Sequence, residues 1–310
     1  MKIAVEDSIK LYNEHLKRLK ELGEVIFYKR EKTSKEQFIN EVKDCEVMVV
    51  NKRFYNDTLS QLKVKFISLW STGYDVMDLE QCKKHNVKVS NVPGYAKNSV
   101  AEHAIALIFE LSKKICLQHN ALKHGKWTRE IPTLIELNGK NIGIIGLGDI
   151  GSQVAKIAYS IGMNVLVYTK TNKKDKFQNY KFVSLNELLK NSDFISLNCL
   201  LSDETKHIIS MEQLKMMKKT AFLINTSRGL LINQKDLIWA LKNNIIAGAG
   251  LDVFETEPLP KEDEISKLGN VVLTPHTAFY TTESVNRLGN IAIDNIENFF
   301  DNKATNVVNG

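Results

Sequence analysis

Short apolar runs rich in β-branched residues alternate with helical patterns along almost the whole chain, and this alternation restricts the fold more than any other feature. One series of runs covers residues 2–5, 24–28, 46–51, 66–70 and 87–91, and a second covers residues 141–146, 163–168, 193–198, 220–225, 246–251 and 270–274. Strands that alternate with helices form parallel sheets with helices on both faces. The pattern therefore predicts an α/β fold built from two doubly wound parallel sheets.

Helix positions follow from the same pattern and from capping residues. We expect helices over residues 8–22, after the capping-box pair Ser34 and Gln37, near Asn56 and from Asp78. Residues 98–124 keep helical spacing of apolar side chains throughout and predict one long helix between the two series.

The chain of 310 residues is long enough for two domains, each with its own core. The last helical pattern, over residues 283–300, follows the second series with no further strand of that series behind it. We expect this helix to return to the first domain. The prediction is a discontinuous, flavodoxin-like domain over residues 1–97 and 283–310, and a Rossmann domain over residues 98–282.

Composition and charge argue against several classes of function. The net charge of +6 comes from basic residues that alternate with acids, which indicates a solvated lysine-rich surface rather than a nucleic-acid partner. No apolar run approaches the ~20 residues that cross a bilayer, and the N-terminus lacks a signal-peptide pattern. The four cysteines form no CxxC pair and lie at no metal-ligand spacing. We expect a cytoplasmic protein with reduced thiols and no metal site.

A glycine motif opens the second series directly after an all-apolar run. Gly146, Gly148 and Gly151 form G-x-G-x-x-G at the junction of a strand and a helix. In this context glycine permits a tight turn and a close approach of the backbone to a pyrophosphate, while the helix start presents amides, including those of Asp149 and Ile150. The motif predicts that this domain binds a dinucleotide, and the alternative is a tight turn in some other doubly wound protein.

The end of the next strand bears on which dinucleotide is bound. An enzyme that uses NAD usually carries an acid here, whereas this chain reads Tyr168, Thr169 and Lys170. Thr169 can donate a hydrogen bond to a 2′-phosphate and Lys170 can pair with it. We expect NADP or NAD as cofactor, with a slight preference for NADP(H). The alternative is that Lys170, Lys173 and Lys174 form an ordinary solvated turn.

Polar residues follow three later strands of the second series, in the segments LINTSRG, AGLDVFETEP and LTPHTAFY. Arg228 has the planar, permanently charged group that binds a carboxylate and a carbonyl oxygen. His276 can donate and accept a proton near neutral pH, and Glu257 can orient its imidazole. These three residues suit the interconversion of a 2-oxo acid and a 2-hydroxy acid. A surface ion pair at Arg228 and a turn residue at Glu257 are the alternatives.

The segments VAEHAIALIFEL, GIIGLGDIG, LINTSRGLL, GLDVFETEP and LTPHTAFYT resemble the D-2-hydroxyacid dehydrogenases in order and spacing. The resemblance implies that Arg228 binds substrate, that Glu257 is the partner of His276, and that His276 is the acid/base. It also implies that the backbone amides of Thr72 and Gly73, in LWSTGYDVMD, hold the substrate carboxylate. Cofactor contacts are expected at Cys199, Thr226 and Asp252, the last of these near the nicotinamide.

The chain departs from the family pattern at Asp149, where a basic residue is common, at Thr169, and at the segment 198–202, which lacks the usual proline. Its substrate stays open. Phe279 would present an aromatic wall and favours lactate-like members, whereas Asn51 and Lys52 favour a polar substrate. A non-catalytic, dinucleotide-sensing corepressor and a phosphite dehydrogenase are the alternative functions. We also expect a homodimer formed through the dinucleotide-binding domain.

Overall fold

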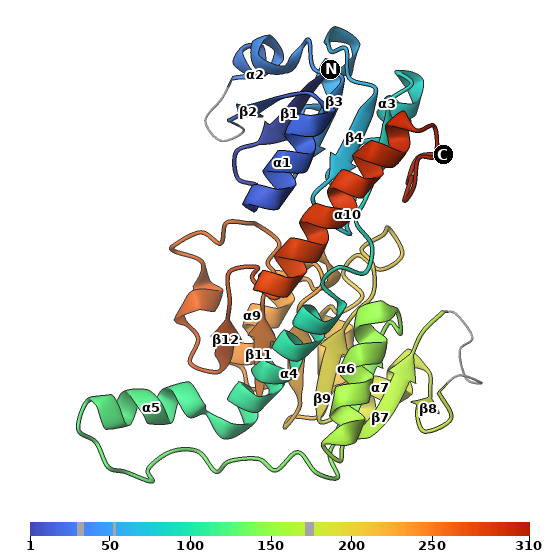
Figure 1. Ribbon diagram of the computed structural model, residues 1–310. Coiled ribbons are helices and arrows are strands. Elements are labelled where there is room, and N and C mark those ends of the chain that lie inside the picture. Colours follow the sequence, from blue (N-terminus) through green and yellow to red (C-terminus); the bar gives the residue numbers. More distant parts are fainter. Residues whose placement is uncertain (30–33, 52–53, 171–176) are drawn as a thin grey trace. The chain divides into compact units, whose positions relative to one another are not determined.

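The computed structural model describes residues 1–29, 34–51, 54–170 and 177–310. The chain divides into two compact units (Figure 1). Unit 1 comprises Met1–Ala96 and Tyr280–Gly310, and unit 2 comprises Lys97–Phe279. Each unit is built on one parallel β-sheet, and this confirms the predicted α/β fold class.

Unit 1 has a five-stranded sheet in the order β2-β1-β3-β4-β5. Its strands are β1 (Lys2–Glu6), β2 (Glu24–Tyr28), β3 (Val47–Val50), β4 (Phe66–Leu69) and β5 (Lys88–Ser90). Its helices are α1 (Asn13–Leu22), α2 (Lys35–Val42), the 3₁₀ helix η1 (Asn56–Gln61), α3 (Leu79–Lys84) and α10 (Thr282–Phe300). The Ser34 hydroxyl accepts the Gln37 amide at 3.2 Å, so the predicted capping box at α2 is confirmed.

The helix α10 completes the core of unit 1 although it lies at the end of the chain (Figure 1). Phe299 stacks on Phe66 of β4 with 4.5 Å between ring centroids. The guanidinium of Arg18, from α1, binds Asp294 at 2.6 Å and Glu297 at 2.8 Å. These contacts pack α10 against both β4 and α1.

Unit 2 has a seven-stranded sheet in the order β12-β11-β10-β9-β6-β7-β8. Its strands are β6 (Asn141–Ile145), β7 (Asn164–Tyr168), β8 (Lys181–Phe182), β9 (Phe194–Leu197), β10 (Phe222–Asn225), β11 (Gly248–Leu251) and β12 (Val271–Leu273). Its helices are α4 (Lys97–Lys113), α5 (Ile115–Lys123), α6 (Asp149–Ser160), α7 (Leu185–Asn191), α8 (Met211–Met216) and α9 (Gln234–Lys242), with 3₁₀ turns η3 (Gly229–Leu231) and η4 (Glu264–Lys267).

The two faces of this sheet are covered by different helices. Along β10, Phe222 and Ile224 pack with α4 and α6, whereas Leu223 packs with α7, α8 and α9. Successive side chains of a strand point to opposite faces, so a strand buried on both faces is apolar along most of its length. This explains why the central strands of unit 2 read as nearly continuous apolar runs.

Two helix predictions were wrong. Helix α1 begins at Asn13 rather than at residue 8, because the Ser8 hydroxyl donates to Glu6 and the Ile9 amide bonds the Glu6 carbonyl in a turn after β1. The predicted helix over residues 98–124 is two helices, α4 and α5, separated by Lys114 in the left-handed conformation. Beyond this break α5 buries none of its residues, so no core holds it in line with α4.

No helix formed by the described residues is long and apolar enough to cross a bilayer. Within the same residues, no group of three or more His, Cys, Asp or Glu side chains is placed to hold a metal ion.

Candidate active site

Three loops at the carboxyl ends of β10, β11 and β12 carry the residues predicted to be catalytic. The Nδ1 atom of His276 lies 2.6 Å from Oε2 of Glu257. The backbone holds the loops in register, because the Asp252 amide donates to Asn225 and the His276 amide donates to the Asp252 carbonyl at 2.8 Å. The carboxyl ends of parallel strands are where open α/β sheets bind ligands.

His276 has a strained backbone and a partly open ring. Its φ angle is 55°, a left-handed conformation that costs a non-glycine residue about 1–2 kcal/mol. The side chain is 41% exposed, and Phe279 lies edge-on to the ring at 6.1 Å between centroids. Since Glu257 occupies Nδ1, and Nε2 bonds no described group, Nε2 is the atom that can exchange a proton with a substrate.

The carboxylate of Glu257 stays ionised although it is partly buried. Burial alone would raise the pKa of Glu257, but the hydrogen bond and charge of His276, the Phe254 amide and the Arg228 guanidinium together lower it. The Phe254 amide reaches Oε1 at 3.0 Å while His276 takes Oε2, so each oxygen has its own donor. An ionised Glu257 accepts a hydrogen bond from Nδ1 of His276 and so fixes the orientation of the ring.

Arg228 is brought to this pair by close packing of two loops. A Cβ atom added at Gly229 would lie 1.9 Å from the carbonyl carbon of Phe254, so only glycine allows this approach. The buried side chain of Asn225 shapes the turn, because it donates to the Arg228 carbonyl at 2.8 Å and accepts the Ser227 amide at 3.0 Å. The structure therefore groups Arg228, Glu257 and His276.

Asp252 is fully buried and has its carboxylate directed at the loop that carries His276. One oxygen accepts the Thr274 hydroxyl at 2.5 Å and the Thr277 amide at 2.9 Å, and the other accepts the Ala278 amide at 2.9 Å. This residue was predicted to lie near the nicotinamide. Its hydrogen-bond partners Thr274, Thr277 and Ala278 all belong to the loop that carries His276.

Sequence reasoning missed His103, which lies in α4. Its Nε2 atom is 2.9 Å from the Thr274 hydroxyl and 3.6 Å from Asp252. Nothing in the helical spacing around this residue distinguishes it from a solvated histidine. The only signal was its place in the segment VAEHAIALIFEL, which resembles the family.

The glycine loop after β6 has the shape that a pyrophosphate requires. Gly146 has a φ of 92°, and an added Cβ would lie 2.7 Å from the Cys199 amide nitrogen. An added Cβ at Gly151 would lie 2.0 Å from the Gly146 carbonyl oxygen, whereas one at Gly148 would meet no atom within 4 Å. The first and third glycines thus close the turn, and the second leaves open space for a ligand.

The start of α6 presents unused donors beside that space. Gly148 provides no side-chain cap, and the amides of Asp149, Ile150 and Gly151 donate to no described acceptor. Unpaired amides at a helix start attract an anion. The exposed carboxylate of Asp149 in the same turn works against this attraction.

Two buried polar atoms near the glycine loop also lack partners among the described residues. They are Oγ1 of Thr226 and Oδ1 of Asn198. The neighbouring Ser227 hydroxyl donates to the Cys199 carbonyl at 2.8 Å, which ties the turn after β10 to the turn after β9. Buried polar atoms without partners are rare in folded proteins. These atoms, the open space at Gly148 and the α6 amides fit a bound dinucleotide.

The surroundings of two predicted cofactor residues bear on their roles. The ammonium of Lys170, which we expected to pair with a 2′-phosphate, instead forms an ion pair with Glu204 that raises the pKa of Lys170. Burial raises the pKa of the Cys199 thiol to about 11, so this residue contributes backbone atoms and bulk rather than a thiolate. Lys173 and Lys174 lie outside the described residues.

The predicted substrate residues of unit 1 follow β3 and β4. The hydroxyl of Thr72 donates to the Val92 carbonyl at 2.7 Å, and the Asn91 amide group donates to the Thr72 carbonyl at 2.7 Å. The backbone amides of Thr72 and Gly73 donate to no described group. The amide of Asn51 donates to the buried Glu6 carboxylate at 3.0 Å, while Lys52 lies outside the described residues.

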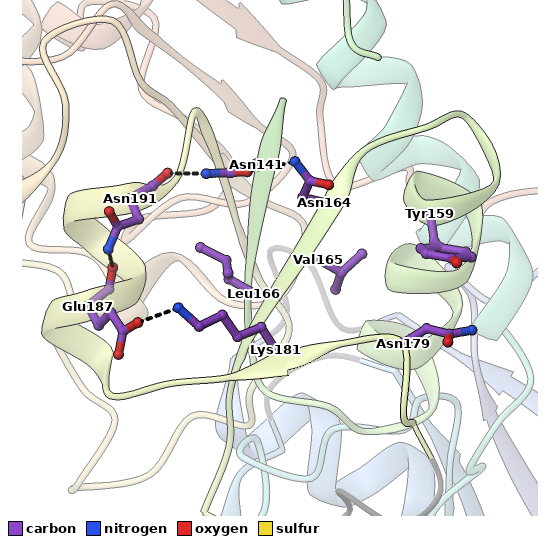
Figure 2. Close-up of a pocket in the computed structure, with 9 residues that line it drawn as sticks. All are labelled: Asn141, Tyr159, Asn164, Val165, Leu166, Asn179, Lys181, Glu187 and Asn191. Carbon is purple, nitrogen blue, oxygen red and sulfur yellow. Dashed lines mark hydrogen bonds and ion pairs between the residues drawn. The ribbon is translucent and has the colours of Figure 1, made fainter. Parts of the chain in front are cut away.

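A cavity of about 550 Å³ lies near the amino ends of β6 and β7, whereas the candidate active site follows the carboxyl ends of the strands (Figure 2). Several of its polar side chains are paired with local groups. Asn141 donates to the Asn191 carbonyl at 2.8 Å, and Lys181 binds Glu187 at 2.8 Å. The glycine loop lies at the carboxyl end of β6, so this cavity is separate from the candidate active site.

The sequence of this chain is similar to those of known proteins. Residues 105–278 match the family model described as D-isomer specific 2-hydroxyacid dehydrogenase, NAD binding domain. A hydroxypyruvate reductase of Blautia hydrogenotrophica is 37% identical over 322 aligned positions, which cover 100% of both chains.

Solved structures match over the whole chain as well. An acyclic imino acid reductase in complex with NADPH and D-Arg has a TM-score of 0.91 at 33% identity, covering 99% of this chain and 100% of that one. The D-lactate dehydrogenase from Aquifex aeolicus, complexed with NAD and lactic acid, has a TM-score of 0.88 at 31% identity, covering 99% of each chain.

Proposed function

Because this chain belongs to the D-isomer-specific 2-hydroxyacid dehydrogenase family, we propose that it reduces a small, polar 2-oxo acid such as hydroxypyruvate to the D-2-hydroxy acid, and catalyses the reverse oxidation. The protein is an NAD(P)-linked oxidoreductase that acts on a CH–OH group. The observation that carries the proposal is the 2.6 Å contact between His276 and an ionised Glu257 beside Arg228.

Each of the three residues has a separate task in the proposed reaction. Arg228 binds the substrate carboxylate and polarises the carbonyl at C2 through its fixed fork of donors. His276 donates a proton from Nε2 to the oxygen that develops negative charge, and Glu257 holds the ring in place through Nδ1. The reduced dinucleotide, when bound, supplies the hydride. In the reverse direction Nε2 accepts the hydroxyl proton.

We propose that unit 1 contributes the amides of Thr72 and Gly73 to carboxylate binding. Two adjacent backbone N–H groups form a small anion site without any charged side chain. The hydroxyl of Thr72 already donates to the Val92 carbonyl. Removing this hydroxyl by substitution would therefore test the stability of the turn rather than a contact with the substrate.

The cofactor is a nicotinamide dinucleotide, and we propose that NADP(H) is accepted as well as NAD(H). Thr169 at the end of β7 brings no negative charge against a 2′-phosphate. Among similar proteins, one structure contains NADPH and another contains NAD.

We further propose that the protein is a homodimer formed through unit 2. Helix α5 extends away from the sheet of unit 2 (Figure 1), and it buries none of its residues. Three apolar side chains of α5 are exposed over half or more of their surface: Ile115, Leu117 and Leu122. Trp127, in the segment that follows α5, is 90% exposed. A second copy of the chain would cover this apolar surface.

A substrate panel tests the proposed reaction. Hydroxypyruvate, glyoxylate, pyruvate, 2-oxoisocaproate and phenylpyruvate are each assayed with NADH and NADPH, with the wild-type chain and with His276→Ala. We expect turnover of hydroxypyruvate that falls about 100-fold or more in His276→Ala. His85→Ala, in unit 1, serves as the matched control and should keep wild-type turnover. Tight dinucleotide binding without any turnover would favour the corepressor alternative.

Reduction of an imine is a second candidate, favoured by the likeness to the acyclic imino acid reductase. Adding methylamine to each assay distinguishes the two reactions. A 2-oxo acid reductase gives the hydroxy acid with or without the amine, whereas an imine reductase gives the N-methylamino acid only when the amine is present.

A further inference from the structure

We propose that His103 is a positioning residue of the hydride-transfer site, which acts on His276 through Thr274 and Asp252. The expected effect on turnover rests on the proposed function, whereas the contacts that support the inference all lie within unit 2. They join α4 to the loop between β12 and the end of unit 2, which holds the reacting histidine.

The direction of each hydrogen bond follows from counting donors. The Thr274 hydroxyl has one hydrogen, and at 2.5 Å from the carboxylate of Asp252 it donates there. Its oxygen can then only accept from Nε2 of His103, 2.9 Å away. The proton of His103 is therefore on Nε2, and the chain of donors runs from His103 through Thr274 to Asp252.

Asp252 passes this constraint to the loop that carries His276. Its carboxylate accepts the amides of Thr277 and Ala278, both at 2.9 Å, and its carbonyl accepts the His276 amide at 2.8 Å. These bonds hold His276 at its φ of 55°, a conformation that a free loop would leave.

Helix α4 anchors the same loop a second time. The buried hydroxyl of Ser99 donates to the Ala278 carbonyl at 2.6 Å. Ser99 and His103 are one helical turn apart and thus share a face of α4. One face of one helix therefore fixes the loop at Thr274, before His276, and at Ala278, after it.

The helix behind this face is packed on several elements of unit 2. Helix α4 packs on β10, β11, β12 and on α6, whose start forms the dinucleotide site. A site built on a packed helix is held more closely than one built on loops alone, and small misplacements of a reacting group cost large factors in rate.

The test compares three single variants and one double variant in the full-length protein. His103→Leu removes the donor, His103→Gln keeps an N–H at a similar reach, and Thr274→Val removes the bridging hydroxyl while keeping its shape. We expect His103→Leu to lower kcat for hydroxypyruvate by about 10-fold or more with little change in KM. His103→Gln should recover most of the loss. The double variant His103→Leu/Thr274→Val should be no slower than the worse single variant, because both break one chain of contacts.

Two results would overturn the inference. One is wild-type kcat and an unchanged pH profile in His103→Leu. The other is an equal loss in His103→Leu and His103→Gln that matches their fall in Tm, which would make the residue merely structural. The control variant is His85→Leu, which changes a histidine of unit 1 outside this chain of contacts.

A readout that needs no turnover separates this inference from the proposed function. In the wild-type chain and in His103→Leu, the ring signals of His276 are followed by NMR as pH is varied. A changed His276 signal in His103→Leu supports the positioning role even if no 2-oxo acid is reduced. An unchanged signal contradicts it even if hydroxypyruvate is an excellent substrate.

Discussion

At the scale of single residues, the behaviour of His276 depends on a carboxylate that keeps its charge. Partial burial makes the charge of Glu257 costly, and two hydrogen-bond donors, His276 and the Phe254 amide, together with the charge of Arg228, compensate for that cost. Because the pKa of Glu257 is lowered, the carboxylate remains ionised through the neutral range in which a histidine exchanges protons. The charged Glu257 thus stays available to hold the ring of His276 through Nδ1.

Glu257→Gln keeps a side chain of the same shape but removes the charge. We expect kcat for reduction to fall by at least about 10-fold, because a neutral amide no longer places a negative charge at Nδ1 of His276 and holds the ring less firmly. Rates measured across a range of pH for both proteins test this loss. The control Glu262→Gln changes an exposed acid that pairs with Lys267. A profile of Glu257→Gln that overlays the wild type would contradict the assigned role.

Lys170 and Glu204 should set the choice between the two cofactors. Glu204 now competes for the ammonium that would bind a 2′-phosphate. Glu204→Gln should raise the ratio of kcat/KM for NADPH over NADH by roughly threefold, the scale of an exposed ion pair, and Lys170→Ala should lower it. The measurement is steady-state kinetics at low and high salt. If neither variant moves the ratio, Lys170 takes no part in cofactor choice.

At the scale of helices and strands, sequence-based prediction was accurate where a local signal decides the element. The strand Glu24–Tyr28 and the capped helix after Ser34 lie where they were predicted, because local periodicity and a local hydrogen bond decide them. The break at Lys114 could not be predicted in this way. The apolar side chains of α5 continue the helical spacing of α4 but face no core of their own chain.

The joint between α1 and α10 should weaken in mild acid. His15 lies buried between these helices, where a Cβ at Gly289 would touch its ring, and burial lowers the pKa of His15 below the usual 6.5. The unfolded chain then binds more protons than the folded chain as pH falls below about 6.5, so the free energy of unfolding should decrease there.

Thermal unfolding between pH 8 and 5.5 measures this decrease. His15→Asn keeps an acceptor for the Tyr12 amide, which now bonds Nδ1 of His15 at 3.3 Å, but it has no titrating group. We expect a flatter dependence of Tm on pH in this variant, and no flattening in the exposed control His119→Asn. An equal slope in the wild type and His15→Asn would assign the acid sensitivity to other groups.

At the scale of the whole molecule, the fold class and the reaction class were both predictable, because the glycine motif and the segments around Arg228, Glu257 and His276 keep their order along the chain. The roles of His103 and Asp252 in the loop of His276 were not predictable. They depend on contacts between α4 and the far end of unit 2, and no local spacing encodes such contacts.

The apolar surface of α5 and Trp127 should hold two copies of the chain together. Leu122→Ser/Trp127→Ser should shift the protein from dimer to monomer in sedimentation velocity measurements across a range of concentrations, since it removes exposed apolar area from the proposed contact. The control Trp239→Ser alters a half-exposed tryptophan of α9. A monomeric wild type, or a double variant that stays dimeric, would contradict this assignment.

The central claim is that hydride passes between the nicotinamide and C2 of a 2-oxo acid, with His276 supplying the proton. The most direct measurement uses reduced cofactor deuterated at C4 of the nicotinamide, hydroxypyruvate as substrate, and mass and chiral analysis of the product. We predict glycerate of the D configuration with one deuterium at C2, formed by the wild type and strongly reduced in His276→Ala. Glycerate without deuterium at C2, or glycerate of the L configuration, would contradict the account.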